Sequence, residues 1–253
     1  MTTKPRGRGR VRIEPTQKRI RTRIRGVDIA DSTRVLMVWE IPYFPTYYFP
    51  SDDVRIDLFT DNGETKRSPS RGTANIRDIT VSDYTAHEAA LVWNKVKLEE
   101  LEGYVSFDWA SMDQWFEEDQ EVYVHARDPY TRIDILQSSR TMRVEVDGAT
   151  VAETTQARIL IETGLPARYY MPKTDVQFQH LTPTDTVTKC PYKGAARYWS
   201  IVVNGETHED LVWGYDTPLP ESRDVAGYVS FYNEKLDIYI DGVLEDKPKT
   251  KFS

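Results

Sequence analysis

The sequence predicts an all-β protein of two tandem homologous domains, each a small, mainly antiparallel sandwich or barrel with little helix. An internal repeat is the first reason: a shift of 122 residues places residues 21–26 on 143–148 and residues 47–50 on 169–172 without a gap. Second, Val144 and Val146 alternate with charged residues, which is the period of a half-buried strand. Third, Asp-Gly and Asn-Gly pairs at 147–148, 204–205 and 241–242 recur at short spacing, as hairpins require.

The N-terminal segment is strongly basic. Residues 1–25 contain ten lysines and arginines but a single acid, Glu14. Residues 1–18 are expected to form a flexible tail, followed at 19–25 by a strand with a charged outer face, because the repeat places this stretch on a strand of the second copy. A basic arm that grips phosphates is the alternative to a solvated tail.

The remaining elements follow in chain order. The first domain is expected at residues 19–125, a linker at 126–137, the second domain at 138–246 and a tail at 247–253. Helical periodicity is weak everywhere, and the best helix candidate covers residues 86–97, with its repeat partner at 206–213. The first copy carries extra residues around 109–120, which predict a longer hairpin loop.

The composition excludes several classes of protein. Among 253 residues there is one cysteine, Cys190, so neither an intramolecular disulfide nor a thiolate zinc cluster can form. The four histidines show no ligand spacing, and no metal site is expected. The longest apolar run covers residues 35–39, far short of a membrane span, and no secretory signal is evident. We therefore expect a cytoplasmic protein without a membrane partner.

Ordered motifs in the second copy carry a family resemblance. They are Leu165-Pro166, Arg168-Tyr169-Tyr170, Asp175-Val176, Cys190-Pro191-Tyr192-Lys193-Gly194, Tyr198-Trp199, Trp213-x-Tyr215-x-x-Pro218 and Gly227-x-Val229-x-Phe231-Tyr232. This pattern resembles the family known as domain of unknown function 427, sometimes labelled nucleotidyltransferase-like, and the first copy is similar to a degenerate member. The resemblance implies a compact antiparallel β fold related to the β-tent folds. It implies no settled activity.

Differences between the copies point to a site. Three of the second copy's polar or aromatic residues, Arg168, Cys190 and Tyr192, are replaced in the first copy by Thr46, Ser68 and Ser70. With small gaps, the sequence also aligns Trp213 with Trp93, Tyr215 with Lys95, and the pair His208-Glu209 with His87-Glu88. One intact pocket in the second domain is the economical interpretation. Its expected ligand-binding residues are Arg168, Tyr170, Tyr192, Trp199, Trp213 and Tyr215, and its candidate catalytic residues are Cys190 and Lys193.

These residues predict binding of a small, anionic, ring-bearing molecule. Aromatic faces would stack on the ring, while Arg168 and Lys193 would hold the anion. Cys190 is a candidate nucleophile, with an inert core thiol as the other interpretation. Whether the protein is an enzyme stays open, and neither a cofactor nor an oligomeric state is predicted. The alternative is a non-catalytic protein or peptide interaction module. A nucleotidyltransferase is less favoured, because no phosphate-binding loop is present, and so is nucleic-acid binding through the basic tail.

Overall fold

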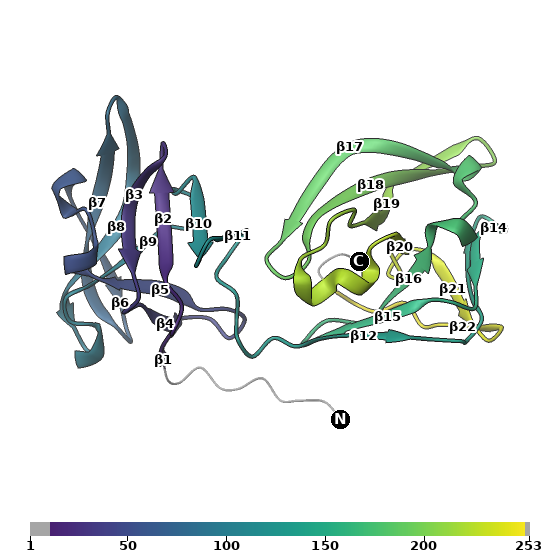
Figure 1. The fold of residues 1–253 in the computed structure, drawn as a ribbon, viewed down its shortest axis with the longest axis horizontal. Coiled ribbons are helices and arrows are strands. Elements are labelled where there is room, and N and C mark those ends of the chain that lie inside the picture. The colour runs from purple at the N-terminus through teal and green to yellow at the C-terminus, as the bar shows by residue number, and fades with distance from the viewer. Residues whose placement is uncertain (1–10, 251–253) are drawn as a thin grey trace. The chain divides into compact units, whose positions relative to one another are not determined.

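The computed structural model describes residues 11–250, which form two compact units (Figure 1). One unit ends at Asp128 and the other begins at Pro129. The helices in this part of the chain are short 3-10 turns: η1 (Ser51–Asp53), η2 (Ile56–Leu58), η3 (Glu99–Leu101), η4 (Lys173–Asp175), η5 (Phe178–His180) and η6 (Pro220–Val225). Among residues 11–250, no helix has the length and apolar character that a membrane crossing needs. The basic segment at 1–10 lies outside the described residues.

Each unit contains two antiparallel sheets. In the first, the seven-stranded sheet runs in the order β1 (Arg12–Pro15), β4 (Leu36–Trp39), β5 (Thr46–Pro50), β9 (Tyr104–Phe107), β8 (Tyr84–Val96), β7 (Gly72–Val81), β6 (Phe59–Ser68). Its four-stranded sheet runs in the order β11 (Gln120–Val122), β10 (Gln114–Glu117), β2 (Ile20–Ile24), β3 (Val27–Ser32).

The second unit repeats this architecture. Its seven-stranded sheet has the order β12 (Ile133–Gln137), β15 (Arg158–Glu162), β16 (Arg168–Pro172), β20 (Tyr228–Phe231), β19 (Glu206–Gly214), β18 (Gly194–Val203), β17 (Leu181–Cys190). The four-stranded sheet consists of β14 (Ala149–Thr154), β13 (Met142–Val146), β21 (Asp237–Ile240) and β22 (Val243–Leu244). The prediction of two tandem, mainly antiparallel all-β domains is therefore confirmed.

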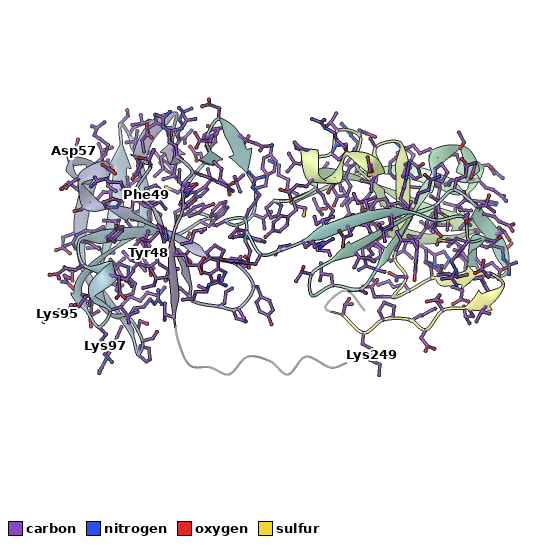
Figure 2. The ribbon with its side chains drawn as sticks, turned by 60° about the horizontal axis from the view of Figure 1, so that its bottom comes forward. Tyr48, Phe49, Asp57, Lys95, Lys97 and Lys249 are labelled. Atoms are coloured by element: carbon purple, nitrogen blue, oxygen red, sulfur yellow. The ribbon has the colours of Figure 1, made fainter. Side chains whose placement is uncertain are left out.

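Residues from both sheets of a domain form its main core. In the first domain, Ile20 of β2 packs in one cluster with Phe49 of β5, and Tyr48, the preceding residue, belongs to a smaller cluster. This split follows from the alternation of side chains along a strand. Figure 2 shows Tyr48 and Phe49 within the domain and Lys95 and Lys97 at its periphery. The seven-stranded sheet of each domain thus carries a main core on one face and a second apolar cluster on the other.

Both domains share a side-chain hydrogen bond at positions that the 122-residue offset places on each other. The Ser32 hydroxyl donates to Asp53 at 2.6 Å, and the Thr154 hydroxyl donates to Asp175 at the same distance. Burial raises the pKa of Asp53, but the hydrogen bond from Arg34 is the larger effect and lowers it overall. The shared aspartates thus anchor the loop after β5 or β16, which is a structural role.

The helix candidates at 86–97 and 206–213 were wrong, because both stretches are strands. In β8 the buried residues are Ala86, Ala89, Ala90 and Trp93, which reproduces helical spacing. The cause is a bulge: Ala86 pairs with Ile79 and Ala90 with Arg77, so one strand has more residues than its partner. The irregular register moves successive side chains out of strict alternation and imitates a helix.

Three other boundaries differ from the expectation. Residues 12–15, assigned to the tail, form β1, and residues 133–137, assigned to the linker, form β12 at the equivalent edge of the second sheet. Residues 114–117, within the stretch around 109–120 that was assigned to a long hairpin loop, form β10, and β11 begins at the end of that stretch, at Gln120. β1, β10 and β12 each pair with a strand distant in sequence, whereas β11 forms a local hairpin with β10.

Candidate functional site

An aromatic cluster lies on the outer face of the second domain's seven-stranded sheet. Tyr170 of β16, Trp213 of β19 and the adjoining Tyr215 are almost fully buried there with Tyr198 of β18. The Trp213 Nε1 donates a hydrogen bond to the Tyr170 hydroxyl at 3.3 Å. Burial raises the pKa of Tyr170 and of Tyr215 far above the ordinary range, and the nearby Cys190 adds to the effect. These tyrosines are therefore neutral hydrogen-bonding groups at physiological pH.

Arg168 covers this cluster and is already paired. Its guanidinium donates to both carboxylate oxygens of Glu234, at 2.5 and 2.7 Å, and also to Asn233. The same guanidinium lies 5.5 Å from the ring centroid of Trp213 and 5.9 Å from that of Tyr232. The Glu234 side chain has no exposed surface. Arg168 is thus held by a carboxylate and two aromatic rings, a partnership that the sequence did not suggest.

Lys193 is also neutralised by a carboxylate. It forms an ion pair with Glu162 of β15, and both side chains are nearly buried. Cys190, at the end of β17, is half-buried. The first domain has the same arrangement, because Arg71 pairs with Glu40 and donates to the Tyr48 hydroxyl at 2.7 Å. The offset of 122 residues places Glu40 on Glu162 and Arg71 on Lys193, and this match is the sequence signal for the pair.

Two of the expected site residues lie apart from this cluster. Trp199 packs on the main-core side of the sheet, with its ring centroid 6.4 Å from Phe178 and 5.4 Å from the Lys173 ammonium. Tyr192 is buried in the turn before β18, where its carbonyl accepts a hydrogen bond from the Ser222 hydroxyl. The structure therefore brings Arg168, Tyr170, Trp213 and Tyr215 together but leaves Trp199 and Tyr192 outside.

Strand register corrects the alignment of the two copies. Trp213 pairs with Tyr198, and in the first domain Leu91 pairs with Ile76. The offset of 122 residues thus persists through these strands, so Trp213 corresponds to Leu91 and Tyr215 corresponds to Trp93. His208 likewise corresponds to Ala86 rather than to His87, since both pair with an isoleucine at the same offset. The gaps introduced by sequence matching were wrong at these positions.

A cavity opens in the first domain where smaller residues replace the second domain's cluster. Thr46, Ile76 and Leu91 stand where the second domain has Arg168, Tyr198 and Trp213. All three smaller residues line a cavity of about 670 Å³, which we call the first-domain cavity. Its wall also includes two aromatic pairs and several polar side chains: Phe44, His125, Trp109, Trp115, Lys66, Glu88, Ser106, Asp108 and Ser111.

The aromatic walls of the first-domain cavity are flat and ordered. Trp109 and Trp115 stack with ring centroids 4.4 Å apart and an angle of 7° between their planes. Phe44 and His125 stack at 3.9 Å and 11°. The Trp115 Nε1 donates to the carbonyl of Trp109 at 3.1 Å, and this bond fixes the pair. Sequence reasoning missed this site, because the cavity arises where side chains are too small to fill the space between the elements. No sequence motif marks such a place.

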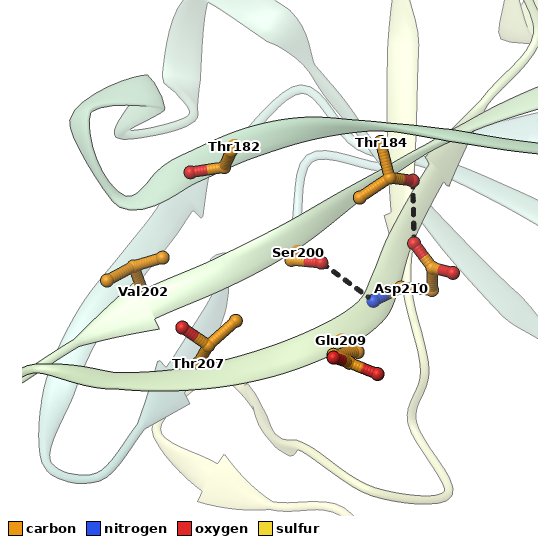
Figure 3. A pocket seen from close by; sticks show the side chains of 7 residues that line it. All are labelled: Thr182, Thr184, Ser200, Val202, Thr207, Glu209 and Asp210. Atoms are coloured by element: carbon orange, nitrogen blue, oxygen red, sulfur yellow. Dashed lines mark hydrogen bonds between the residues drawn. The ribbon is translucent and has the colours of Figure 1, made fainter.

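The second domain also has a polar groove, of about 400 Å³ (Figure 3). Asp210 organises it, accepting hydrogen bonds from the Thr184 and Thr186 hydroxyls at 2.7 and 2.6 Å. The Asp210 amide donates to the Ser200 hydroxyl at 3.2 Å. Because these groups satisfy one another, the groove offers few uncommitted polar atoms to a ligand. Its lining residues are Thr182, Thr184, Ser200, Val202, Thr207, Glu209 and Asp210.

Fold and repeat together define a tandem all-β protein in which each domain joins a seven-stranded and a four-stranded antiparallel sheet. A family model described as a domain of unknown function, DUF427, matches residues 12–118 and again residues 134–242. The chain therefore belongs to the DUF427 family as a tandem of two copies, and the resemblance found in the sequence is confirmed. A search of curated proteins finds no match.

Proposed function

We propose that this chain is a small-molecule-binding protein and that a ring-bearing ligand occupies the first-domain cavity. The observation that carries the proposal is the cavity itself. Its volume of about 670 Å³ falls within the range of roughly 300–1,000 Å³ that ligand pockets have. Aromatic walls with a few convergent polar groups are the usual lining of such pockets.

The chemistry of the lining favours a flat ligand with polar substituents. Trp115 is buried beneath Trp109, whereas Trp109, Phe44 and His125 are partly exposed and offer their outer ring faces for a planar ring to stack on. Asp108 is held in place by two hydrogen bonds from Ser111, at 3.0 and 2.9 Å, so its carboxylate is oriented. Carboxylate acceptors beside aromatic faces select hydrogen-bond donors on a ring. The expected ligand class is therefore a planar heterocycle carrying N–H or O–H groups.

The second-domain cluster is the other candidate location, and it fits the anionic, ring-bearing ligand that the sequence suggested. The guanidinium of Arg168 beside two aromatic rings favours it. An anion there would have to displace Glu234 from Arg168 or Glu162 from Lys193, because each cation already has a carboxylate partner. A covalent step through Cys190 would belong to this location.

The two locations can be separated with fluorescent ring probes. We expect the neutral probe N-phenyl-1-naphthylamine to bind the full chain saturably, and Leu91→Trp to weaken that binding at least tenfold. This substitution places in the cavity the side chain that the second domain has at the same position. The control is the paired replacement Arg168→Met with Glu234→Leu, which removes the second-domain cation without leaving an unpaired charge. We expect it to leave probe binding unchanged.

The opposite pattern identifies the second location. If the anionic analogue 8-anilinonaphthalene-1-sulfonate binds and only the paired replacement abolishes its binding, the ligand site belongs to the second domain. Absence of saturable binding of the neutral probe would contradict the first-domain proposal, and so would equal binding by Leu91→Trp. Circular dichroism and thermal unfolding establish that each variant is folded before binding is compared.

A further inference from the structure

Two hairpin turns of the second domain bring three metal-binding side chains together. Asp147 follows β13, while Glu206 and His208 lie at the start of β19. One ligand atom from each of the three lies within 4.8 Å of the others. The His208 Nε2 is 2.7 Å from the Asp147 Oδ2. No spacing in the sequence marks this group, because Asp147 is distant in the chain from the other two.

The turns fix the backbone from which these side chains project. Asp147 and Gly148 have φ angles of +48° and +78°, and Asn204 and Gly205 have φ angles of +52° and +84°. Two consecutive residues with positive φ are typical of the tight type I′ hairpin turn. The Asn204 side-chain amide also donates to the Asp147 carbonyl at 3.4 Å, which joins one turn to the other. Asp147 therefore lies in one turn, Glu206 and His208 follow directly after the other, and the two turns are linked to each other.

The charge of this corner is not balanced by the protein's own cations. Among residues 11–250, no lysine or arginine forms an ion pair with Asp147 or Glu206, and His208 is the only ion-pair partner described for Asp147. The Asp147 side chain is 45% exposed and that of His208 is 27% exposed, so an ion from solution can reach both. Two carboxylates and an imidazole thus face solvent together.

The first domain fills the equivalent corner with a cation of its own. At the offset of 122 residues, Arg25 replaces Asp147, Tyr84 replaces Glu206 and Ala86 replaces His208. The Arg25 guanidinium lies 4.8 Å from the centroid of the Tyr84 ring. In the first domain, Arg25 therefore places a positive charge at this corner. In the second domain, two carboxylates and an imidazole at the same corner can bind a cation.

We propose that Asp147, Glu206 and His208 form a divalent metal site, with Zn²⁺ as the expected ion. Carboxylate oxygens and a neutral imidazole nitrogen are zinc ligands at about 2.0–2.2 Å, and three protein ligands leave a fourth position for water. Two ligands of a tetrahedral zinc ion lie about 3.3 Å apart. In the proposed site the side chains rotate to bring the three atoms from within 4.8 Å of one another to that spacing, and the ion links the two hairpins.

Titration calorimetry with Zn²⁺ on the chelator-treated full chain tests the site. We expect one ion to bind per chain, and His208→Ala to weaken binding at least tenfold, since alanine is the first domain's residue at this position. Asp147→Asn keeps the shape of the turn and is expected to weaken binding similarly. His87→Ala is the matched control, because His87 forms an exposed pair with Asp78 in the first domain at 2.8 Å. It should leave the affinity unchanged.

Cobalt(II) gives an independent readout. We expect the visible absorption of tetrahedral Co²⁺ to appear with the wild-type chain and with His87→Ala, and to be lost with His208→Ala. Zinc binding weaker than a Kd of about 1 mM would mean an adventitious ion only and would overturn the proposal. The same conclusion follows if His208→Ala and Asp147→Asn, shown to be folded by circular dichroism, bind zinc as tightly as the wild type.

Discussion

Replacing Glu234 with glutamine is expected to lower the free energy of unfolding of the second domain by about 3–5 kcal/mol, because it leaves a buried guanidinium without its counter-charge. The Glu234 side chain is fully buried and that of Arg168 is 12% exposed. Urea unfolding of the full chain, followed by hydrogen exchange of peptides from each domain, measures the loss and locates it.

The exposed pair of Arg55 and Asp57 provides the control. It has a similar two-point geometry, with distances of 2.8 and 2.7 Å, but both side chains are more than half exposed. Solvent screens such a pair, so Asp57→Asn is expected to change stability by less than about 1 kcal/mol. If Glu234→Gln lowers the free energy of unfolding by no more than Asp57→Asn does, the pair of Arg168 and Glu234 is not a buried ion pair.

The same carboxyl makes the stability of the second domain depend on pH. Burial raises the pKa of Glu234, but the hydrogen bonds from Arg168 and Thr250 outweigh it and leave the pKa below the usual value. A carboxyl with a lowered folded-state pKa stabilises the fold above its unfolded pKa, and this contribution disappears as the pH falls through the folded value. The wild-type domain should therefore lose it below about pH 4, and Glu234→Gln should lack this part of the pH profile.

The fold could be predicted because its signals are local or repeated. Alternation in a stretch such as 143–147 shows a strand directly, and comparison of the chain with itself shows the duplication. The exceptions follow from strand pairing. The bulge opposite Arg77 in β8 imitates a helix, and β1 and β12 are too short to be recognised without knowledge of their partners.

The candidate site was predictable only in part. Arg168 was identified because the first copy has Thr46 in its place, and Tyr170 and Trp213 because their aromatic faces could stack on a ring. Glu234 could not be, since no pattern links it to an arginine 66 positions earlier. Comparison of the copies also favoured the domain with more reactive residues, yet those side chains pack on one another. Their replacement by Ile76 and Leu91 opens a cavity, and residue types alone do not show this.

The two copies thus differ in how they use one sheet face. In the second domain, a buried ion pair and four aromatic rings close that face. In the first domain, Arg71–Glu40 takes the place of the second domain's Lys193–Glu162 pair, but Thr46 replaces Arg168, so the Arg168–Glu234 pair has no counterpart there, and the neighbouring positions are reduced in size. Loss of large side chains is therefore not loss of function in itself, because a ligand pocket requires volume that a well-packed cluster does not leave.

Substituting Gly72 with alanine is expected to destabilise the first domain by about 3 kcal/mol or more, whereas Gly194→Ala should cost the second domain roughly 1–2 kcal/mol. The two glycines hold the same place in the repeat, with φ angles of +118° and +98°, so both variants suffer backbone strain. Only Gly72 also faces a backbone collision. A Cβ there would lie 2.0 Å from the Lys95 carbonyl oxygen, but at Gly194 the nearest atom is 3.5 Å away.

The backbone carbonyl of Lys95 cannot easily move away from a methyl group added at position 72. It belongs to β8, where Val96 pairs with Gly72 itself and Lys95 pairs with Thr73. Moving it would break hydrogen bonds at the end of the β7–β8 ladder. Hydrogen exchange in peptides from residues 72–96 of Gly72→Ala, compared with residues 194–214 of Gly194→Ala, measures the two costs in their own domains. Equal protection in both would mean that φ strain alone sets the cost and that β8 yields at this point.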